Sequence, residues 1–436
     1  LGRAGRYKLN KKLGLSLPNI KENYILTKED IIITIAYLIK LQNQNKEVNV
    51  DDIDHLVNRR VRSIGELVTN SAFRIGLLRL ERTIKEKMSL AQTSAPLAPS
   101  SVINARPVIA AINDFFRTSQ LSTILDQTNP LSEIDNLRRL TVMGTGGISR
   151  ERASFSIRDI NASQYGRICP VRSPEGPNIG LVTYLALYAK VNEYGFLETP
   201  YRKVVVKNHK VKITPEIIYL SADDEQKYYI THSGVKISKD GIILEERVPV
   251  RFNGEFLEVF KDQVQLIDLS SRQVVGAAAS LIPFLANDEA NRALMGTHIQ
   301  CQAVPLVTAT SPVVGTGMEK AVVEAMGRTV RARHKGKVIF VDSQKIIIKL
   351  SEKPSQADNS KQFNSFNGIS ENIKIEEDQE IYRLDKFKRS VQSTCYSQKP
   401  LVSVGQTIEK DDLLIDGPAS DHGELALGQN MTIAYM

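Results

Sequence analysis

Apolar residues recur at the spacing of an amphipathic helix near the start of the chain. This pattern predicts a helix over residues 27–42, with Thr27 as its N-cap and Asp30 three positions later. A second, longer helix is predicted over residues 64–88, and the Ser/Ala/Pro-rich stretch 91–101 that follows it favours a surface loop. The first third of the chain is therefore expected to be mainly helical.

Glycines and prolines interrupt the apolar runs from residue 140 to 198, which is typical of loops joined by short strands. Residues 201–268 alternate apolar and polar positions and predict a small strand-rich module. Residues 337–350 predict a hairpin whose turn contains Asp342, and the polar segment 351–380 is expected to be a solvated or flexible loop. Together these patterns predict a mixed α+β fold with several domains.

Composition and charge are those of an ordinary soluble globular protein. The 436 residues are 42% apolar and 24% charged, with 57 Lys and Arg against 49 Asp and Glu and a net charge of +8. At about 150 residues per domain, this length predicts about three domains. The most apolar stretch, residues 31–41, is shorter than the roughly 20 residues of a membrane span, so no membrane crossing is expected.

Cysteines and histidines form no recognisable chemical motif. Cys169, Cys301 and Cys395 lack the paired spacing of a disulfide framework or a thiolate metal site, which favours a reducing compartment. The six histidines are scattered, and no HExxH, Walker or GxSxG motif is present. Carboxylates at 51–54 lead into a basic segment and are interpreted as a surface turn. The sequence therefore predicts no metal site and no complete catalytic centre.

Arginine replaces lysine over a long central stretch. No lysine lies between Lys87 and Lys190, yet this stretch holds nine arginines, whose guanidinium groups suit phosphates and buried carboxylates. Seven acids share the stretch, so internal ion pairing is one interpretation. A glycine pair beside Arg150 and Arg152 favours the other, a loop in which several donors converge on phosphate.

Basic residues are also concentrated at 320–349, where eight Lys and Arg stand against two acids. In a strand, Arg331, Arg333 and Lys335 would project from one face. Such a ribbon could follow a nucleic-acid backbone, although a charged strand face in solvent is the plainer interpretation.

Two short segments place polar groups in defined geometry. Residues 287–296 predict a helix that Asn287 caps and Gly296 ends, in which Arg292 lies one turn after Asp288, so spacing alone favours a salt bridge between them. Residues 174–178 predict a stiff turn with a carboxylate and an amide at its rim. This turn either faces a ligand or simply connects two strands.

Longer segments resemble a known family in sequence and order. They are residues 51–66, 119–134, 166–181, 287–296 and 416–430. They are similar to the β subunit of bacterial-type multisubunit DNA-directed RNA polymerase, and the resemblance covers essentially the whole chain. Since the chain opens without an initiator Met and stops abruptly, we expect a central fragment of a longer subunit.

The resemblance implies an architecture: a helical lobe and fork portion followed by strand-rich external and hybrid-binding modules. The implied domains are the end of the lobe (1–48), the fork with the rifamycin-binding region (49–200), a small external domain (201–268) and the truncated start of the hybrid-binding domain (269–436).

The resemblance also implies roles for individual residues. Arg292 resembles an arginine that reaches the incoming nucleotide, and Glu175 resembles an acid beside the same site. The residues expected to contact nucleic acid are Arg150 and Arg152 near downstream DNA, and Arg139, Asn178 and Gln302 along the nascent RNA. No complete catalytic set is expected on this chain, because such enzymes hold the catalytic Mg²⁺ mainly on the partner β′ subunit. The isolated chain is therefore expected to be inactive.

The partners implied are the β′ subunit, the α dimer, a sigma factor, template DNA, nascent RNA and nucleoside triphosphates. The implied location is the cytoplasm, associated with the nucleoid, with a plastid as the alternative. A free-standing nucleic-acid-binding module is the alternative function.

A rifamycin pocket is implied as well. Its residues are Thr123, Asp126, Asn136, Arg139, Thr141, Pro174, Asn178 and Val182. Three of them depart from the usual sensitive pattern, since Thr123 stands where Gln is usual, Asn136 where His is usual and Thr141 where Ser is usual. We therefore expect reduced sensitivity to rifamycins.

Overall fold

The computed structural model describes residues 1–43, 50–90, 98–207, 210–351, 373–376 and 378–436. The chain begins with α1 (Arg3–Leu13), η1 (Lys21–Tyr24) and α2 (Lys28–Gln42). Thr27 and Asp30 exchange side-chain to backbone hydrogen bonds at the start of α2, which confirms the predicted helix and its cap. Asp30 also forms a fully buried ion pair with Arg6 at 2.8 Å, and this guanidinium holds the pKa of Asp30 well below its usual range.

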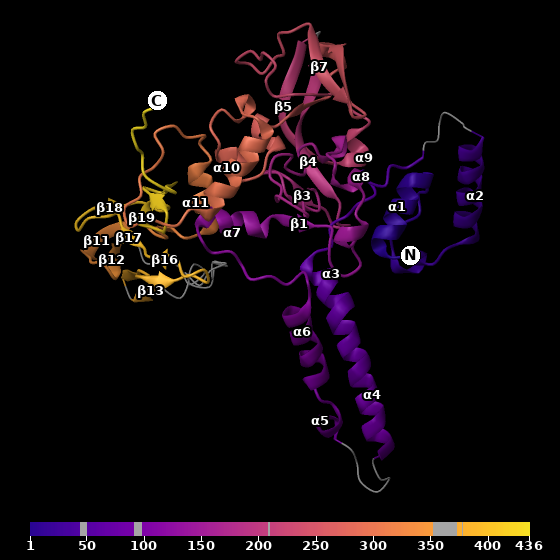
Figure 1. The fold of residues 1–436 in the computed structure, drawn as a ribbon, viewed down its shortest axis with the longest axis horizontal. Coiled ribbons are helices and arrows are strands. Elements are labelled where there is room, and N and C mark those ends of the chain that lie inside the picture. Colours follow the sequence, from indigo (N-terminus) through magenta and orange to yellow (C-terminus); the bar gives the residue numbers. More distant parts are fainter. Residues whose placement is uncertain (44–49, 91–97, 208–209, 352–372, 377) are drawn as a thin grey trace.

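A pair of long helices projects from the body of the molecule (Figure 1). The elements are α3 (Ile64–Val68), the π-helical turn η2 (Thr69–Phe73), α4 (Arg74–Leu90), α5 (Pro99–Val102) and α6 (Arg106–Thr118). Gly76 lets α4 approach α6 closely, since a Cβ at this position would lie 2.9 Å from the Cα of Val108.

The helix predicted over residues 64–88 is thus confirmed, with a π turn inside it. The loop predicted over residues 91–101 is wrong at Pro99–Val102, because Pro99 occupies the first position of a short helix, where its missing N–H costs nothing. Residues 91–97 lie outside the described residues.

The next region begins with the two-turn helix α7 and then consists of loops, single helical turns and short strands, as predicted for residues 140–198. Its elements are α7 (Pro130–Leu137), β1 (Arg139–Thr141), η3 (Arg150–Arg152), α8 (Phe155–Arg158), η4 (Ala162–Gln164) and β2 (Val182–Tyr184). β1 and β2 pair antiparallel, with Arg139 opposite Tyr184 and Thr141 opposite Val182. This ladder gives the surrounding loops a fixed frame.

A strand-rich module follows, which confirms the prediction for residues 201–268. Its elements are β3 (Lys190–Val191), β4 (Leu197–Lys207), β5 (Lys210–Ser221), α9 (Ala222–Glu225), β6 (Ile230–Thr231), β7 (Arg247–Phe252), β8 (Glu255–Phe260), η5 (Lys261–Gln263) and β9 (Leu266–Asp268). The sheet order is β3-β4-β9-β6-β7-β8, with β5 paired to β4, and β6 and β9 alone run parallel. The sheet starts earlier than the predicted module, at Lys190.

Helices lead into the last part of the chain. They are η6 (Ser271–Val274), η7 (Ala279–Leu281), η8 (Leu285–Asn287), α10 (Ala290–Gln302) and α11 (Glu319–Met326). α10 and α11 both pack against α7, so that residues far apart in sequence meet at this junction (Figure 1).

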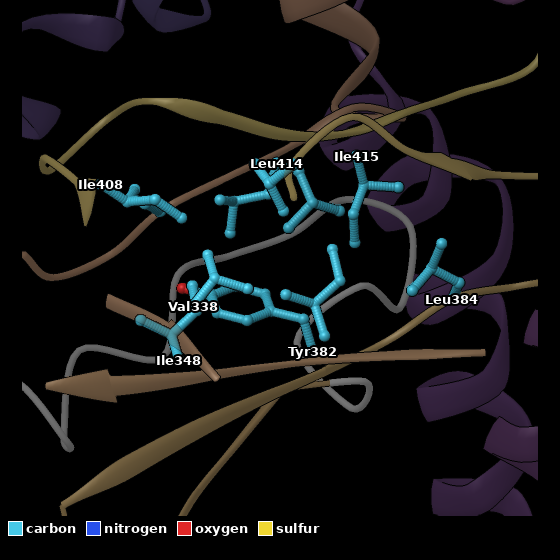
Figure 2. Packing of buried hydrophobic residues seen from close by; sticks show 11 residues of the cluster. Val338, Ile348, Tyr382, Leu384, Ile408, Leu414 and Ile415 are labelled. Carbon is cyan, nitrogen blue, oxygen red and sulfur yellow. The ribbon is translucent and has the colours of Figure 1, made fainter. Parts of the chain in front are cut away.

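The last part of the chain folds mainly into two sheets. The strands are β10 (Val330–Arg331), β11 (Gly336–Val341), β12 (Lys345–Leu350), β13 (Ile373–Glu376), β14 (Gln379–Arg383), β15 (Lys388–Arg389), β16 (Cys395–Tyr396), β17 (Lys399–Pro400), β18 (Thr407–Ile408), β19 (Leu413–Asp416), β20 (Ser420–Asp421) and β21 (Glu424–Leu425). One sheet has the order β13-β14-β12-β11-β18 and the other β10-β19-β17. Figure 2 shows the apolar core that the strands enclose, with Ile348, Ile408 and Leu414 all fully buried.

The predicted hairpin is confirmed as β11 and β12, and the Asp342 carboxylate accepts the backbone N–H groups of Gln344 and Lys345 in its turn. The loop predicted over residues 351–380 is wrong at β13 and the start of β14, because β14 pairs antiparallel with β12 and β13 pairs antiparallel with β14. Residues 352–372 and 377 lie outside the described residues.

The fold is mixed α+β and multidomain, as predicted. No helix in the described part of the chain has both the length and the apolar character needed to cross a membrane.

Candidate functional site

A hollow of about 160 Å³ lies beside α7 and β1. Its lining includes four of the predicted pocket residues: Thr123, Asp126, Asn136 and Arg139. Local hydrogen bonds shape this wall, since the Asp126 carboxylate accepts the backbone N–H of Thr128 at 3.1 Å and its hydroxyl at 2.7 Å. The Arg139 side chain is exposed at the rim.

The other four predicted pocket residues do not line this hollow. Thr141 and Val182 face each other on the β1–β2 ladder, and Pro174 and Asn178 belong to the turn that precedes β2. Arg158 holds that turn by donating to the carbonyl oxygens of Pro177 and Ile179 at 2.9 and 2.8 Å. The predicted pocket is therefore divided between a hollow and an adjoining ladder and turn.

Asn178 Oδ1 is buried and has no hydrogen-bond partner among the described residues. An amide oxygen held without a partner has unused capacity to accept a hydrogen bond.

The floor of the hollow is a buried ion pair between Arg172 and Asp135. Arg172 Nη2 lies 2.7 Å from Asp135 Oδ2, and Nε donates to the same oxygen at 2.8 Å. Burial raises the pKa of the Asp135 carboxyl, although Arg172 opposes this shift. The Cys301 thiol lies 3.7 Å from Asp135 Oδ2, and burial together with this carboxylate raises its pKa to about 12, so that it stays protonated.

Arg292 lies in the first turn of α10 and its side chain is exposed. The guanidinium Nη1 lies 3.7 Å from Met295 Sδ, and no carboxylate of the described residues is within ion-pair distance. The salt bridge to Asp288 that spacing alone favoured is therefore absent. Arg292 presents a free cationic fork to solvent.

The helix itself differs from the predicted one. α10 begins after Glu289 and continues through Gly296 to Gln302, so neither the predicted cap at Asn287 nor the predicted end at Gly296 is correct. Gly296 does not end the helix because Thr297 and Cys301 bury the next turns of the same face, and tertiary packing outweighs the weak helix propensity of glycine.

Glu175 is exposed in its turn, and its Oε1 lies 3.5 Å from His298 Nδ1. His298 lies on α10, so this contact brings the turn to the helix that carries Arg292. The structure therefore places the two predicted nucleotide-binding residues on adjoining elements.

The predicted nucleic-acid contacts do not all lie together, and they differ in exposure, since Asn178 is half-buried and the other four are exposed. Arg139 lies at the hollow, and Gln302 is exposed at the end of α10 beside Cys301, which lines the hollow. Arg150 and Arg152 are exposed in η3, and Arg158 Nη2 donates to the carbonyl oxygen of Arg150 at 3.4 Å.

Both interpretations of residues 331–335, a basic ribbon along nucleic acid and a charged strand face in solvent, assumed a strand that does not form. β10 ends at Arg331, whose side chain pairs with Glu324 and donates to the carbonyl oxygen of Asp411 at 2.8 Å. Lys335 pairs with Glu409 at 3.1 Å. These internal ion pairs form because the chain bends after β10 instead of continuing as a strand.

The chain matches four family models. They are RNA polymerase Rpb2, domain 2 (residues 1–62), RNA polymerase Rpb2, domain 3 (123–191), RNA polymerase beta subunit external 1 domain (201–270) and RNA polymerase Rpb2, domain 6 (331–436). Over all of its length the chain is also 48% identical to the DNA-directed RNA polymerase subunit beta of Anaeromyxobacter sp. (strain K) and to that of Geobacter metallireducens. The chain belongs to the RNA polymerase β-subunit family. It spans 29% and 30% of the length of these two relatives.

Other side chains of this β-subunit chain matter to the site but carry no direct signal in the sequence. In the sequence, Arg172 is one of nine arginines in the central stretch and nothing distinguishes it from the others. Asn129 precedes Pro130, which is a pattern typical of a helix start. That pattern could have identified Asn129 as the α7 cap, but not its contacts with α10.

RNA polymerases are metal-dependent enzymes, so the metal needs a set of ligands. The described part of this β-subunit chain has no group of three or more His, Cys, Asp and Glu side chains that could hold a metal ion. The described residues of this chain therefore do not fit such a site.

Proposed function

We propose that this chain is part of the β subunit of a DNA-dependent RNA polymerase and helps to form its active-site cleft. In this proposal Arg292 contacts the phosphates of the incoming nucleoside triphosphate. The observation that carries the proposal is the exposed Arg292 guanidinium, which has no carboxylate partner among the described residues, on a helix whose opposite face is buried.

The chemistry of Arg292 suits this role. A guanidinium offers several N–H donors in a planar fork and binds phosphate oxygens in a bidentate manner. An arginine already paired with a carboxylate would have to break that pair first, whereas Arg292 only leaves a weak contact with Met295. Glu175 is proposed to lie beside the same site.

The other contacts follow from accessibility and from the family. We infer that Arg139, Asn178 and Gln302 lie along the nascent RNA and that Arg150 and Arg152 face downstream DNA. Mg²⁺ is proposed to be held mainly by the β′ subunit, so the isolated chain is expected to add no nucleotides. A free-standing nucleic-acid-binding module has less support, because Arg331 and Lys335 form internal ion pairs.

The assembly that we infer contains the β′ subunit, the α dimer, a sigma factor, template DNA, nascent RNA and nucleoside triphosphates, in the bacterial cytoplasm at the nucleoid. We further propose that the hollow and the adjoining ladder and turn together form a rifamycin-binding surface. The lining of the hollow by Thr123, Asp126, Asn136 and Arg139 supports this proposal.

The test of the proposed function is single-nucleotide addition by assembled polymerase that carries Arg292→Ala in the complete β subunit. Loss of a charge-assisted contact costs about 1.5 to 3 kcal/mol, so incorporation should slow by roughly tenfold to a few hundredfold. Asn291→Ala, at the neighbouring exposed position of α10, is the matched control and should keep normal kinetics. Unchanged kinetics in Arg292→Ala would refute the role.

A further inference from the structure

One side chain closes the ends of two helices. Asn129 Oδ1 accepts the backbone N–H of Ser132 at 2.8 Å and so caps the start of α7. Its Nδ2 donates to the carbonyl oxygens of the last residues of α10 and of Ala303, at 2.9 Å to Gln300, 3.2 Å to Cys301 and 2.9 Å to Ala303. The two N–H hydrogens of this buried amide are thus shared among three carbonyl oxygens at the end of α10, where a helix leaves such groups short of partners.

A second side chain holds the buried face of α10. Arg172 Nη1 donates to Thr297 Oγ1 at 3.5 Å, and Nη2 lies 3.7 Å from Cys301 Sγ. The same guanidinium is fixed from the other side by Asp135 on α7, and it stacks over the Tyr184 ring with its Cζ 4.8 Å from the ring centroid. Its orientation is therefore determined by three elements at once.

These two contacts define where α10 lies. Asn129 fixes the end of the helix along its axis, and Arg172 fixes its rotation, because Thr297 and Cys301 lie on one face one turn apart. Arg292 is on the same helix, five residues before Thr297, so any rotation or shift of α10 moves its guanidinium.

We propose that Asn129 and Arg172 are positioning residues, which hold α10 so that Arg292 meets the phosphates of the incoming nucleotide. This inference rests on the proposed function of Arg292. Neither residue touches the nucleotide in this scheme. Both act through the placement of the helix, and small displacements of a contacting group have large kinetic effects.

The sharpest variant is Asn129→Ser in the complete β subunit of the assembled polymerase. Serine is a good N-cap and keeps the start of α7, but its short hydroxyl cannot replace the amide at the α10 carbonyls. The nucleotide concentration that gives half-maximal addition should rise about tenfold, with a smaller change in the maximal rate, because a displaced Arg292 binds the phosphates of the nucleotide less tightly.

The control is a double-mutant cycle with Arg292→Ala. If Asn129 acts through Arg292, Asn129→Ser should add no further defect in the Arg292→Ala background. Equal defects in both backgrounds would overturn the positioning inference and leave the proposed function intact. Normal kinetics for Arg292→Ala alone would instead refute the proposed function, and the positioning role with it.

Arg172→Lys provides an independent second arm. Lysine keeps a positive charge for Asp135 but lacks the fork that reaches Thr297 and Cys301. The same rise in half-maximal nucleotide concentration, again absent in the Arg292→Ala background, is expected. Normal kinetics for Arg172→Lys would contradict its share of the role, and polymerase assembly measured by gel filtration separates such effects from misfolding.

Discussion

The junction of α7 with α10 and α11 and the core enclosed by the C-terminal strands are both buried, but they differ in their polar content. The junction combines an apolar cluster that includes Leu131 and Val322 with buried ion pairs, Asp135 with Arg172 at 2.7 Å and Glu133 with Arg328 at 2.7 Å. Aliphatic side chains such as Ile348 fill the C-terminal core (Figure 2).

This difference teaches how a site is kept in place. Apolar burial is strong but has no direction, so a core of this kind stabilises a fold without fixing the angle of any one element closely. Hydrogen bonds and ion pairs require defined geometry, so a buried polar pair restricts the orientation of the elements that carry it. The junction includes α10, the helix that carries Arg292. A rigid junction keeps the Arg292 guanidinium in a fixed position.

The largest expected effect comes from breaking the polar junction. Asp135→Ala leaves the Arg172 guanidinium buried without its carboxylate, which should cost about 3 to 5 kcal/mol. Amide hydrogen exchange of α10 should report this loss as a lower free energy of local opening. The exposed Asp159→Ala is the control. A loss equal to that of the control would show that the ion pair does not hold the junction.

The apolar core should respond differently. Ile348→Ala removes a fully buried side chain and should lower the free energy of unfolding of this region by about 2 to 5 kcal/mol. Ile339→Ala, in the same hairpin but 43% exposed, should lose much less. Denaturant unfolding measures both. If Ile348→Ala also changed nucleotide addition at temperatures where the enzyme stays folded, the distinction between the two regions would fail.

Rifamycin inhibition probes the hollow next to the junction. Each hydrogen bond lost at Thr123, Asn136 and Thr141 is worth about 0.5 to 1.5 kcal/mol, hence about 1.5 to 4.5 kcal/mol if the three act independently. Thr141 should matter least, since it keeps a hydroxyl. The triple variant Thr123→Gln/Asn136→His/Thr141→Ser should therefore be inhibited at markedly lower rifamycin concentrations. Superimposable inhibition curves would show that the three departures are neutral.

A smaller effect is expected from acid on the buried pair at the start of the chain. Because Arg6 lowers the pKa of Asp30 in the folded state, this carboxylate stabilises the fold above its unfolded pKa of about 3.9. That contribution is lost as the pH falls below this value, so exchange protection of α1 and α2 should decrease between neutral and strongly acidic pH. Asp30→Asn should remove this dependence, and an unchanged profile would contradict the assignment.

Local patterns predicted local structure well. The α2 cap joins residues three positions apart, and the β11–β12 hairpin joins neighbouring strands. The Asn129 contacts instead cross 171 to 174 positions, and the Arg172 contact with Thr297 crosses 125. No periodicity connects such residues, which is why the length of α10 and the function of its supports were missed.

The basic ribbon considered at 331–335 also depended on contacts that local spacing does not reveal. Lys335 pairs with Glu409, which lies 74 positions away. The candidate site residues came from resemblance rather than from local pattern. Helical spacing favoured an ion pair between Asp288 and Arg292 that does not form. Spacing along the sequence gives the distance between two residues of a helix, but it does not give the direction in which that helix packs.

Because of the π turn η2, the first long helix of the projecting pair can lose a residue at one place more easily than at another. A π turn accommodates one residue more than an α-helical turn, so losing Asn70 would restore a regular helix and leave Gly76 facing Val108. Losing Leu78 instead would rotate every later residue of α4 by about 100°, because a regular helix has 3.6 residues per turn and no surplus to give up. The two parts of one continuous helix therefore differ in how their length can vary, with the boundary between Phe73 and Arg74.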